Sequence, residues 1–476
     1  MEDLARQTLS ALWQLGGLDV SQLDEVDITG QDPVLPGVFH VGVAAGVSIA
    51  AVGAAAAALW HERTGRRQRV KVDMLEAALM FRSERYLRIE GKPPPSPWGP
   101  LSGYYRTGDD RVVQIHANFP HHHAGILKLL ECPALHERSP SEDSLRQERL
   151  AVKDALKHWR GQEFEDRASA ADLCVGMLRE RKEWQSHPQG QALTGLPLLE
   201  IEKVGDSPPE ALPEGERPLS GIRALDLTRI IAGPVCGRTL AAHGADVLRV
   251  SAAHLPLIPH IWLDHARGKR SAHLDLNTLA GRNRLQELVR ECDVFLQAYR
   301  PGAIAAKGFG VTDVAQLRPG VVYVTLSAYG HAGPWSGRRG FDSLVQTVSG
   351  IGQAGALAAN REGTLPLPCQ ALDHATGYLA AFGAMIALRQ RAREGGSWRV
   401  RVSLAQTHQW LWQMGQIDGL DYPEPDTGAV AAACEKYTSS EGIISAVKSA
   451  EKLSETPAFW NRPATPLGAD EPIWLH

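Results

Sequence analysis

The chain has 476 residues, enough for two or three domains of roughly 150 residues each. Lys and Arg number 50 against 54 Asp and Glu, a net charge of −4 that argues against a nucleic-acid-binding protein. Its six cysteines form no C-x-x-C pair, which argues against a disulfide framework or a zinc ribbon and favours a reduced compartment. No basic stretch precedes an apolar run at the N-terminus, so we expect no signal peptide and a cytoplasmic protein.

Residues 41–60 form a stretch of twenty residues without a charge, long enough to span a bilayer. Nine of the twenty are alanine, which adds little transfer free energy, and no aromatic belt precedes the stretch. We therefore expect a buried core helix and no membrane association.

An internal repeat is visible at an offset of 330 residues. When residues 53–76 are laid on residues 383–406, eight of the 24 pairs are identical, among them Gly53 with Gly383 and Val70 with Val400. Both copies show an Ala-rich helical stretch, a basic Gly turn and a short alternating strand. The distance between them indicates duplication of one structural unit and not a solenoid.

Two Pro-rich stretches, residues 91–100 and 205–218, are expected to be joints between domains. Between them, residues 103–117 have the pattern of a hairpin with a Gly-Asp-Asp turn, followed by helical stretches. We predict an N-terminal segment with a partial copy of the large domain (1–95), a small α+β domain (96–215), a large domain (216–424) and a C-terminal tail (425–476).

The large domain alternates strands and helices in the order typical of a parallel sheet covered on both faces. The sequence thus predicts an α/β fold with a Rossmann-like parallel sheet. Predicted strands are 222–228, 246–251, 271–276, 294–299 and 321–330, and predicted helices are 234–245 and 279–291.

The loop after the first predicted strand, residues 228–237, lacks the G-x-G-x-x-G fingerprint of nicotinamide and flavin sites. Ala232 and Gly233 are nevertheless small enough to let backbone N–H groups approach a phosphate at the start of the next helix. A plain tight loop without a ligand is the alternative.

Basic residues recur where such a sheet presents its ligand-binding edge. Arg229, Lys269 and Arg300 follow or open successive strands. Arginine grips phosphate oxygens in bidentate fashion, so the three together suit a nucleotide with several phosphates. A solvated charged surface is the alternative for each residue alone.

Asp373 sits just before a long, mostly apolar stretch that we expect to be a helix. One role for it is the N-cap, which accepts hydrogen bonds from the first backbone N–H groups. A carboxylate at a helix start can also be a nucleophile beside donors that stabilise an oxyanion. The two roles are compatible.

Three consecutive histidines, His121, His122 and His123, suggest metal binding at first sight. Consecutive residues of a regular helix or strand cannot converge on one ion, and no H-E-x-x-H motif accompanies them. We therefore predict no metal site.

Six stretches together resemble the family III CoA-transferases, also called the CaiB/BaiF family. The motifs stand in family order and spacing and cover most of residues 216–410, while residues 40–200 resemble the family's small domain. The stretches are LSGIRALDLTRIIAGPVCGRTLAAHGADVLRV (219–250), RGKRSAHLDL (267–276), QAYRPGAIAAKGFG (297–310), VYVTLSAYGHAGPW (322–335), RGFDSLVQTVSG (339–350) and ALDHATGYLAAFGAMIALRQRAREGG (371–396).

The resemblance implies that CoA or an acyl-CoA is a substrate, with no tightly bound cofactor. By motif, Arg229, Lys269 and Arg300 would contact the CoA, with Ala232 in the loop beside it. Asp373, in LDHATG, would attack the acyl-CoA thioester to give a mixed anhydride. The partners implied are an acyl-CoA, a small carboxylic acid and a second copy of the chain in a homodimer.

The chain also departs from the family pattern. Its small domain comes first, so the chain is permuted or fused from a tandem copy. The N-terminal copy has Gly42 and Val43 where the other has the nucleophile, so we expect one functional site. Ser251 replaces the acid usual after the second strand, and Phe341 replaces the histidine of the family's racemases, which argues against racemisation.

Three functions remain open from the sequence. The first is CoA transfer from an acyl-CoA to a carboxylic acid through an aspartyl anhydride. The second is isomerisation, dehydration or lysis of an acyl-CoA by a member of the same family, and the third is a catalytically silent CoA-binding protein.

Overall fold

The computed structural model describes residues 4–132 and 141–475. Its contacts divide into two compact units. The large unit holds Met1–Pro94, Pro197–Ser327 and Cys369–His476, and the small unit holds Pro95–Leu196 and Ala328–Pro368. Compared with the predicted boundaries, residues 197–215 lie in the large unit and residues 328–368 in the small one.

The large unit is built around a sheet of seven strands in the order β10-β9-β8-β11-β12-β13-β7. Every neighbouring pair is parallel except β13 with β7, which is antiparallel. This confirms the predicted α/β fold with a mostly parallel sheet. The strands are β7 Leu199–Gly205, β8 Arg223–Leu227, β9 Asp246–Ser251, β10 Lys269–His273, β11 Val294–Gln297, β12 Val322–Ser327 and β13 Ser397–Ser403.

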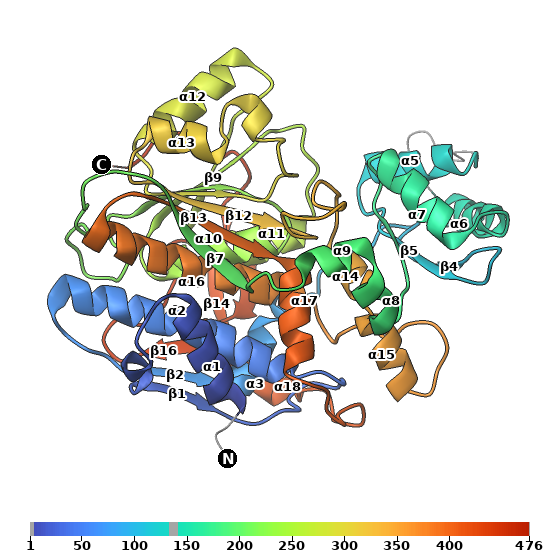
Figure 1. Cartoon of the computed structure of the whole chain (residues 1–476), viewed down its shortest axis with the longest axis horizontal. Coiled ribbons are helices and arrows are strands. Elements are labelled where there is room, and N and C mark those ends of the chain that lie inside the picture. The colour runs from blue at the N-terminus through green and yellow to red at the C-terminus, as the bar shows by residue number, and fades with distance from the viewer. Residues whose placement is uncertain (1–3, 133–140, 476) are drawn as a thin grey trace. The chain divides into compact units, whose positions relative to one another are not determined.

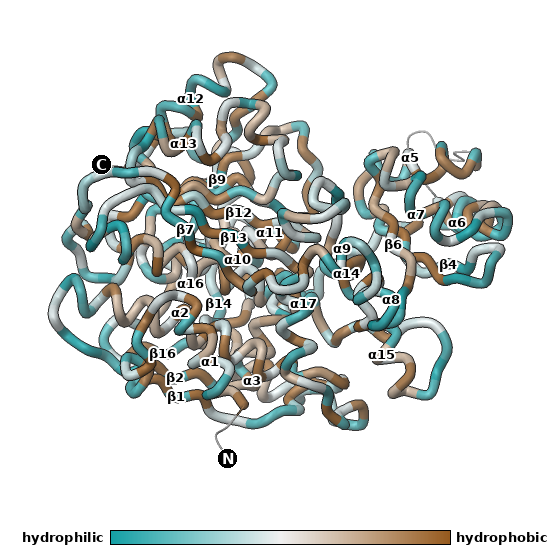
Figure 2. The backbone as a smooth tube through the Cα atoms, viewed as in Figure 1, coloured by the Kyte–Doolittle hydropathy of each residue, from teal (hydrophilic) through white to brown (hydrophobic). Residues whose placement is uncertain are grey.

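Helices cover both faces of this sheet, because alternate strand residues point to opposite sides. On one face, Leu225 and Phe295 pack in one buried cluster with Leu288 of α12 (Leu279–Arg290) and Val314 of α13 (Val311–Leu317). On the other face lie α10 (Ala232–Ala242) and α16 (Ala371–Glu394). In Figure 2 the central strands are mainly hydrophobic and α12 is largely hydrophilic.

The internal repeat predicts two related helices, and the structure contains them. Helix α2, Val41–Thr64, and helix α16, Ala371–Glu394, have 24 residues each, and their bounds differ by the same 330 positions as the repeat. Both are long and apolar enough to cross a membrane, but 89% and 100% of their most apolar windows are buried within the protein. The expectation of a buried core helix at residues 41–60 is confirmed.

The strands that follow these helices pair in matching ways. Strand β2, Val70–Asp73, lies between β1 (Val26–Thr29), which is parallel to it, and β16 (Glu451–Leu453), which is antiparallel. Strand β13 likewise lies between parallel β12 and antiparallel β7. Strand β16, from the C-terminal part of the chain, is thus the antiparallel edge of the sheet that contains β1 and β2. Strand β7 is the antiparallel edge of the seven-stranded sheet.

The remaining elements of the large unit are short. A third sheet has the order β14-β15-β3, so part of the predicted C-terminal tail is folded into strands. These elements are α1 Leu4–Leu15, α3 Met74–Met80, α4 Ser83–Tyr86, β3 Arg88–Ile89, α11 Pro259–His265, α17 Leu404–Gln413, α18 Thr427–Ala433, β14 Cys434–Ser439, β15 Gly442–Val447 and the 3₁₀ turns Val20–Leu23 and Ala305–Lys307.

The small unit is α+β. The predicted hairpin is present as β4 (Gly103–Arg106) and β5 (Val112–Ile115), and β6 (Val175–Met177) pairs with β5 in the order β4-β5-β6. Its core packs the hairpin against three helices through residues such as Val113, Val152 and Phe164. The helices are α5 Pro120–Leu129, α6 Glu142–Leu156, α7 Gly161–Ala170, α8 Arg181–Ser186, α9 Pro188–Leu193, α14 Asp342–Val348 and α15 Ile351–Ala358.

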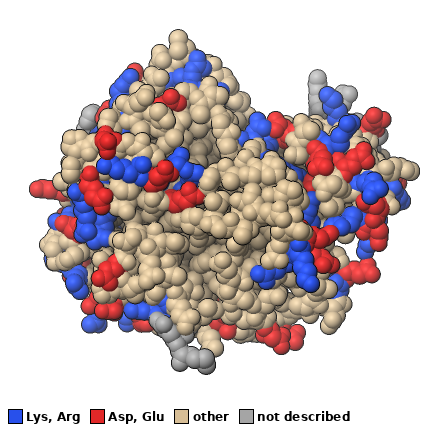
Figure 3. Space-filling model, viewed as in Figure 1, with Lys and Arg blue, Asp and Glu red and all other residues tan. Residues whose placement is uncertain are grey.

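Figure 3 shows charges of both signs, mainly toward the periphery of this face, whose centre is largely uncharged. Ion pairs between neighbouring side chains at the protein surface include Arg146 with Asp143 at 2.6 Å and Lys157 with Asp154 at 2.7 Å. Mixed charge of this kind gives no extended basic field on that face.

Candidate functional site

Asp373 is the third residue of α16 and lies in its first turn. The helix begins at Ala371 with Gln370 as its N-cap residue, so the N-cap role considered for Asp373 is wrong: the helix starts earlier than its apolar pattern indicates. The first turn is the positive end of the helix dipole, which favours a carboxylate there. Asp373 is 8% exposed, so it is surrounded mainly by protein.

Helix α16 meets the start of α10 one turn beyond Asp373. A Cβ on Gly377 would lie 2.5 Å from the carbonyl oxygen of Ala232 and 2.7 Å from the Cβ of Val235, so only glycine permits this approach. Residues four apart lie on the same face of a helix, which puts Asp373 on the α10 side of α16. Gly377, one turn beyond Asp373, thus packs on the start of α10, where Ala232 lies.

The loop between β8 and α10 has a strained backbone. Ile230 has φ 75°, in the left-handed region that a β-branched residue rarely adopts. A Cβ on Gly233 would meet the side chain of Thr228 at 2.3 Å, so the loop is tightly folded. Strain of this kind persists where the surroundings hold a functional loop in shape.

Asp226, near the carboxyl end of β8, holds this loop in place through hydrogen bonds. One carboxylate oxygen accepts a hydrogen bond from the backbone N–H of Thr228 at 2.9 Å and another from its hydroxyl. The other oxygen accepts a hydrogen bond from the Lys269 ammonium at 2.7 Å.

Lys269 does not present its charge to a ligand. Its side chain is 0% exposed, and Nζ donates to Asp226 and to the carbonyl oxygen of Pro234 at 2.8 Å. Burial lowers the pKa of the ammonium, against the attraction of Asp226. We therefore correct its predicted role: Lys269 supports the β8–α10 loop from within and is not a surface for CoA phosphates.

Arg229 and Arg300 follow two strands that are neighbours in the sheet, β8 and β11. The chain leaves β8 toward β9 and β10 and returns to β11, so this is the point where the strand order reverses. Ligands of open α/β sheets bind outside the carboxyl ends of the strands at such a point. Both arginines are half-buried there.

Arg249 is a functional candidate that the sequence reasoning missed. It projects from β9, is 4% exposed, donates to the Ser251 hydroxyl at 2.8 Å and lies 4.6 Å from the Trp262 ring centre. Burial raises the pKa of the Tyr299 phenol, while Arg229 and Arg249 pull it down, so the three groups are close. An arginine inside the apolar strand DVLRVS was the available signal.

The three histidines at residues 121–123 point to different partners. His122 Nε2 lies 3.8 Å from the Cys174 sulfur, whereas His123 Nε2 lies 3.0 Å from a Glu148 oxygen. Within residues 4–132 and 141–475, no three His, Cys, Asp or Glu side chains are grouped so as to hold a metal ion.

Phe341, the position of the racemase histidine, lies in the small unit as the N-cap residue of α14. Its ring stacks on the His116 imidazole with 3.7 Å between ring centres and 7° between planes. The next residue, Asp342, is 1% exposed and accepts a hydrogen bond from Gln346.

The start of α2, the counterpart of the Asp373 turn, is occupied by the chain itself. The two carboxylate oxygens of Asp32 accept hydrogen bonds from the backbone N–H groups of Gly42 and Val43, each at 2.9 Å. A Cβ on Gly42 would lie 2.3 Å from Asp32 Oδ1. These N–H groups are therefore already bound to a carboxylate.

The chain is similar to known proteins. The family model for CoA-transferase family III matches residues 7–203 and 219–467. Acetyl-coenzyme A transferase nodX of Hypoxylon pulicicidum is 30% identical over 334 residues, which cover 65% of this chain and 54% of that protein. Succinyl-CoA:glutarate CoA-transferase of Homo sapiens is 33% identical over 193 residues, which cover 38% of this chain and 43% of that protein.

Among solved structures, a CAIB/BAIF family protein of Brucella suis is similar with a TM-score of 0.37 and 23% identity, covering 48% of this chain and 65% of that one. The chain spans about half the length of the curated relatives it matches. The match of the family model over most of the sequence confirms the resemblance seen in the motifs. The chain therefore belongs to CoA-transferase family III.

Proposed function

We propose that this chain transfers CoA from an acyl-CoA thioester to a carboxylic acid, with Asp373 as the nucleophile. The observation that carries the proposal is the position of Asp373. Its carboxylate lies in the first turn of α16, one helical turn from the point where Gly377 packs on the start of α10. The strained β8–α10 loop, which Arg229 opens, ends at that same point.

The chemistry needs a carboxylate nucleophile and no redox partner. An Asp373 oxygen attacks the thioester carbonyl carbon, the C–S bond breaks, and CoA leaves as a thiolate while a mixed anhydride remains on Asp373. The thiolate attacks the aspartyl carbonyl of the anhydride, which releases the donor carboxylate and leaves an aspartyl-CoA thioester. A carboxylate nucleophile suits this step because the anhydride is reactive toward the thiolate.

The second half repeats these steps in reverse order. The acceptor carboxylate attacks the aspartyl thioester, which expels the CoA thiolate and forms a new anhydride. The thiolate then attacks the acceptor's acyl carbon, and the new acyl-CoA leaves with Asp373 restored as a carboxylate. Backbone N–H groups at the start of α16 are suited to stabilise the oxyanion of each tetrahedral intermediate.

Arg229 and Arg300 are our candidates for the phosphates of CoA. Both follow strands at the reversal point of the sheet, and guanidinium groups bind phosphate oxygens in bidentate fashion. Lys269 supports this site through Asp226, which holds the loop that contains Arg229, and through the carbonyl oxygen of Pro234.

The test is replacement of the nucleophile. Asp373→Ala and Asp373→Asn should each lower the transfer rate roughly 10³-fold or more, because neither replacement has a carboxylate that can form the anhydride. Glu394→Gln, at the exposed far end of the same helix, should keep full activity. The rates are measured with a panel of acyl-CoAs and an isotopically labelled acceptor acid.

Two outcomes of this experiment discriminate between functions. Label that enters the CoA pool identifies a transferase, whereas conversion of the acyl-CoA without label identifies an isomerase, dehydratase or lyase. Mass spectrometry of the protein should find a hydroxylamine-sensitive adduct on Asp373. Full transfer activity in Asp373→Ala would refute the nucleophile assignment.

A further inference from the structure

We propose that residues 82–85, from the N-terminal segment, hold the first turn of α16 in place and so position Asp373, with Glu84 as the principal positioning residue. The inference rests on the proposed function of Asp373. It gives a role to the copy of the repeat that has no nucleophile of its own. We call Arg82, Ser83, Glu84 and Arg85 the 82–85 clamp.

Two side chains of the 82–85 clamp contact the residues on either side of Asp373. A Glu84 carboxylate oxygen lies 3.1 Å from Nε2 of His374, the next residue of α16. Arg85 donates to the side-chain oxygen of Gln370, the N-cap residue, at 3.3 Å. The turn that carries Asp373 is therefore held on both sides by α4.

The Glu84–His374 contact is buried. The His374 side chain is 0% exposed and that of Glu84 is 7% exposed. Burial works to raise the pKa of Glu84, but the hydrogen bond with His374 and the nearby Arg85 guanidinium act to lower it, so the pKa lies below its usual value and the carboxylate is ionised at neutral pH. A ring contact with Phe81, 5.4 Å between centres, fixes the imidazole from another side.

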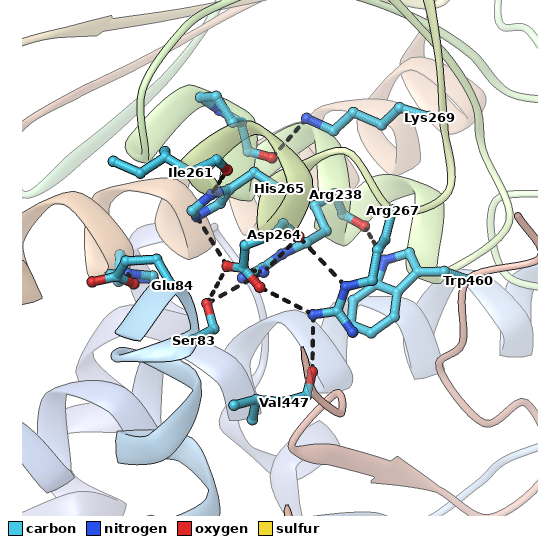
Figure 4. A network of polar contacts seen from close by, with 12 residues as sticks. Ser83, Glu84, Arg238, Ile261, Asp264, His265, Arg267, Lys269, Val447 and Trp460 are labelled. Atoms are coloured by element: carbon cyan, nitrogen blue, oxygen red, sulfur yellow. Dashed lines mark hydrogen bonds and ion pairs between the residues drawn. The ribbon is translucent and has the colours of Figure 1, made fainter. Parts of the chain in front are cut away.

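The 82–85 clamp is itself connected to α10 and α11 of the large unit through Asp264. The Ser83 hydroxyl donates to the carboxylate of Asp264, which also pairs with Arg238 at 2.9 Å and Arg267 at 3.5 Å (Figure 4). Arg238 belongs to α10 and Asp264 to α11.

This network consists of paired charges that are almost entirely buried. Asp264, Arg238 and Arg267 are all at most 1% exposed. Burial opposes the charge of Asp264, but Arg238, His265 and Arg267 more than offset it and hold its pKa well below the usual range. The Arg267 guanidinium also lies 3.9 Å from the Trp460 ring centre and donates to the carbonyl oxygen of Val447 at 2.9 Å.

The repeat supports a dedicated role for these residues. At the offset of 330, Arg82, Ser83, Glu84 and Arg85 correspond to Trp412, Gln413, Met414 and Gly415, so three of the clamp's polar residues have no polar counterpart. The charged residues occur only in the copy without a nucleophile. They contact the helix of the copy that has one.

The test uses Glu84→Gln and Glu84→Ala in the full chain, with Glu76→Gln as the control. Glu76 lies on α3 of the same segment and pairs with Lys452 at 2.7 Å near the surface. Each variant is assayed for kcat, for KM of the acyl-CoA, for the rate of adduct formation on Asp373 and for its melting temperature. Asp373→Ala is assayed alongside.

We expect both Glu84 variants to lower kcat by roughly 10-fold to 100-fold, as small misplacements of a reacting group do, with KM changed less than about 3-fold. Adduct formation on Asp373 should slow by the same factor, and Glu76→Gln should match the parent protein. The proposal holds if kcat falls in Glu84→Gln at a temperature where that variant is fully folded.

Three results would overturn the proposal. One is an unchanged kcat in Glu84→Gln, and a second is a raised KM with kcat intact, which would indicate direct substrate contact. The third is a loss of kcat that only follows the fraction of unfolded protein. If Asp373→Ala is itself active, the proposed function fails; if it is inactive while Glu84→Gln is normal, only the clamp fails.

Discussion

His116 is a buried histidine in the small unit that stays neutral over most of the acid range. Burial in the first place, and the nearby His122 in the second, lower its pKa to about 3 from 6.5. In the unfolded chain the same imidazole takes up a proton near pH 6.5. Between these values the unfolded state binds more protons, so this group makes the protein less stable as pH falls.

We predict that His116→Gln flattens the pH dependence of stability. The parent should lose roughly 2 kcal/mol from this group between pH 6.5 and pH 5, at about 1.4 kcal/mol per unit of pH. Urea unfolding at the two pH values measures the difference. His158→Gln, at an exposed position of the same unit, should keep the parent's slope; equal slopes in all three proteins would contradict the prediction.

At the scale of single residues, the sequence picks out candidates for the site, but it does not predict which contacts their side chains make. Asp373, Ala232, Arg229 and Arg300 each follow from a motif or a loop position. Whether a cation faces solvent depends on its partner, and the partner of Lys269, Asp226, lies 43 residues away. Glu84 is 290 residues from His374, so no local pattern could connect them.

At the scale of elements, the two copies of the repeat use glycine in the same way. A Cβ on Gly53 would lie 2.6 Å from Cγ1 of Val70, and one on Gly383 would lie 2.6 Å from Cγ1 of Val400. Both pairs are related by the offset of 330. Each glycine lets its long helix approach the strand that follows it, which explains why these positions are identical in the two copies.

We expect Gly53→Ala and Gly383→Ala to destabilise the protein by similar amounts, about 1–3 kcal/mol each, because the added methyl group overpacks the helix–strand contact. Chemical unfolding of the two variants measures this cost. Gly337→Ala is the matched control, since nothing lies within 4 Å of a Cβ there. A neutral effect at either core glycine would refute the shared packing role.

The repeat and the alternation of strands and helices made most elements predictable, including the hairpin of the small unit. The pairing of β7 with β13 and of β16 with β2 was not. Strand β7 precedes β13 by almost 200 residues, and its alternating side chains are only partly buried, so its sequence favours the surface of a small domain as much as the edge of a sheet. Partner choice between distant strands is decided by tertiary packing.

At the scale of the whole chain, the last residues are part of the core. Trp474 is 5% exposed, packs in the buried cluster of α12 and the central strands, and donates to the carbonyl oxygen of Leu288 at 3.0 Å. Strand β16, which also lies near the C-terminus, pairs with β2 in the N-terminal sheet. The end of the described chain therefore packs against elements that lie much earlier in the sequence.

Replacement of Trp474 by Ala should cost about 3–5 kcal/mol, the usual range for removing a buried indole. Trp98→Ala should cost less than about 1 kcal/mol, because Trp98 is 43% exposed. Melting temperatures and urea midpoints of the two variants give the comparison. Equal losses of stability in the two variants would show that Trp474 does not stabilise the core as we propose.

The homodimer and the cytoplasmic location stay predictions.

The Asp32 carboxylate at the start of α2 has a consequence for stoichiometry. The backbone N–H groups that would stabilise an acyl intermediate in that copy already donate hydrogen bonds to Asp32. The side chain of Val43 has no oxygen that could be acylated. A titration with an excess of activated donor should therefore stop at one equivalent of bound acyl group per polypeptide, with the duplicated helix start inert.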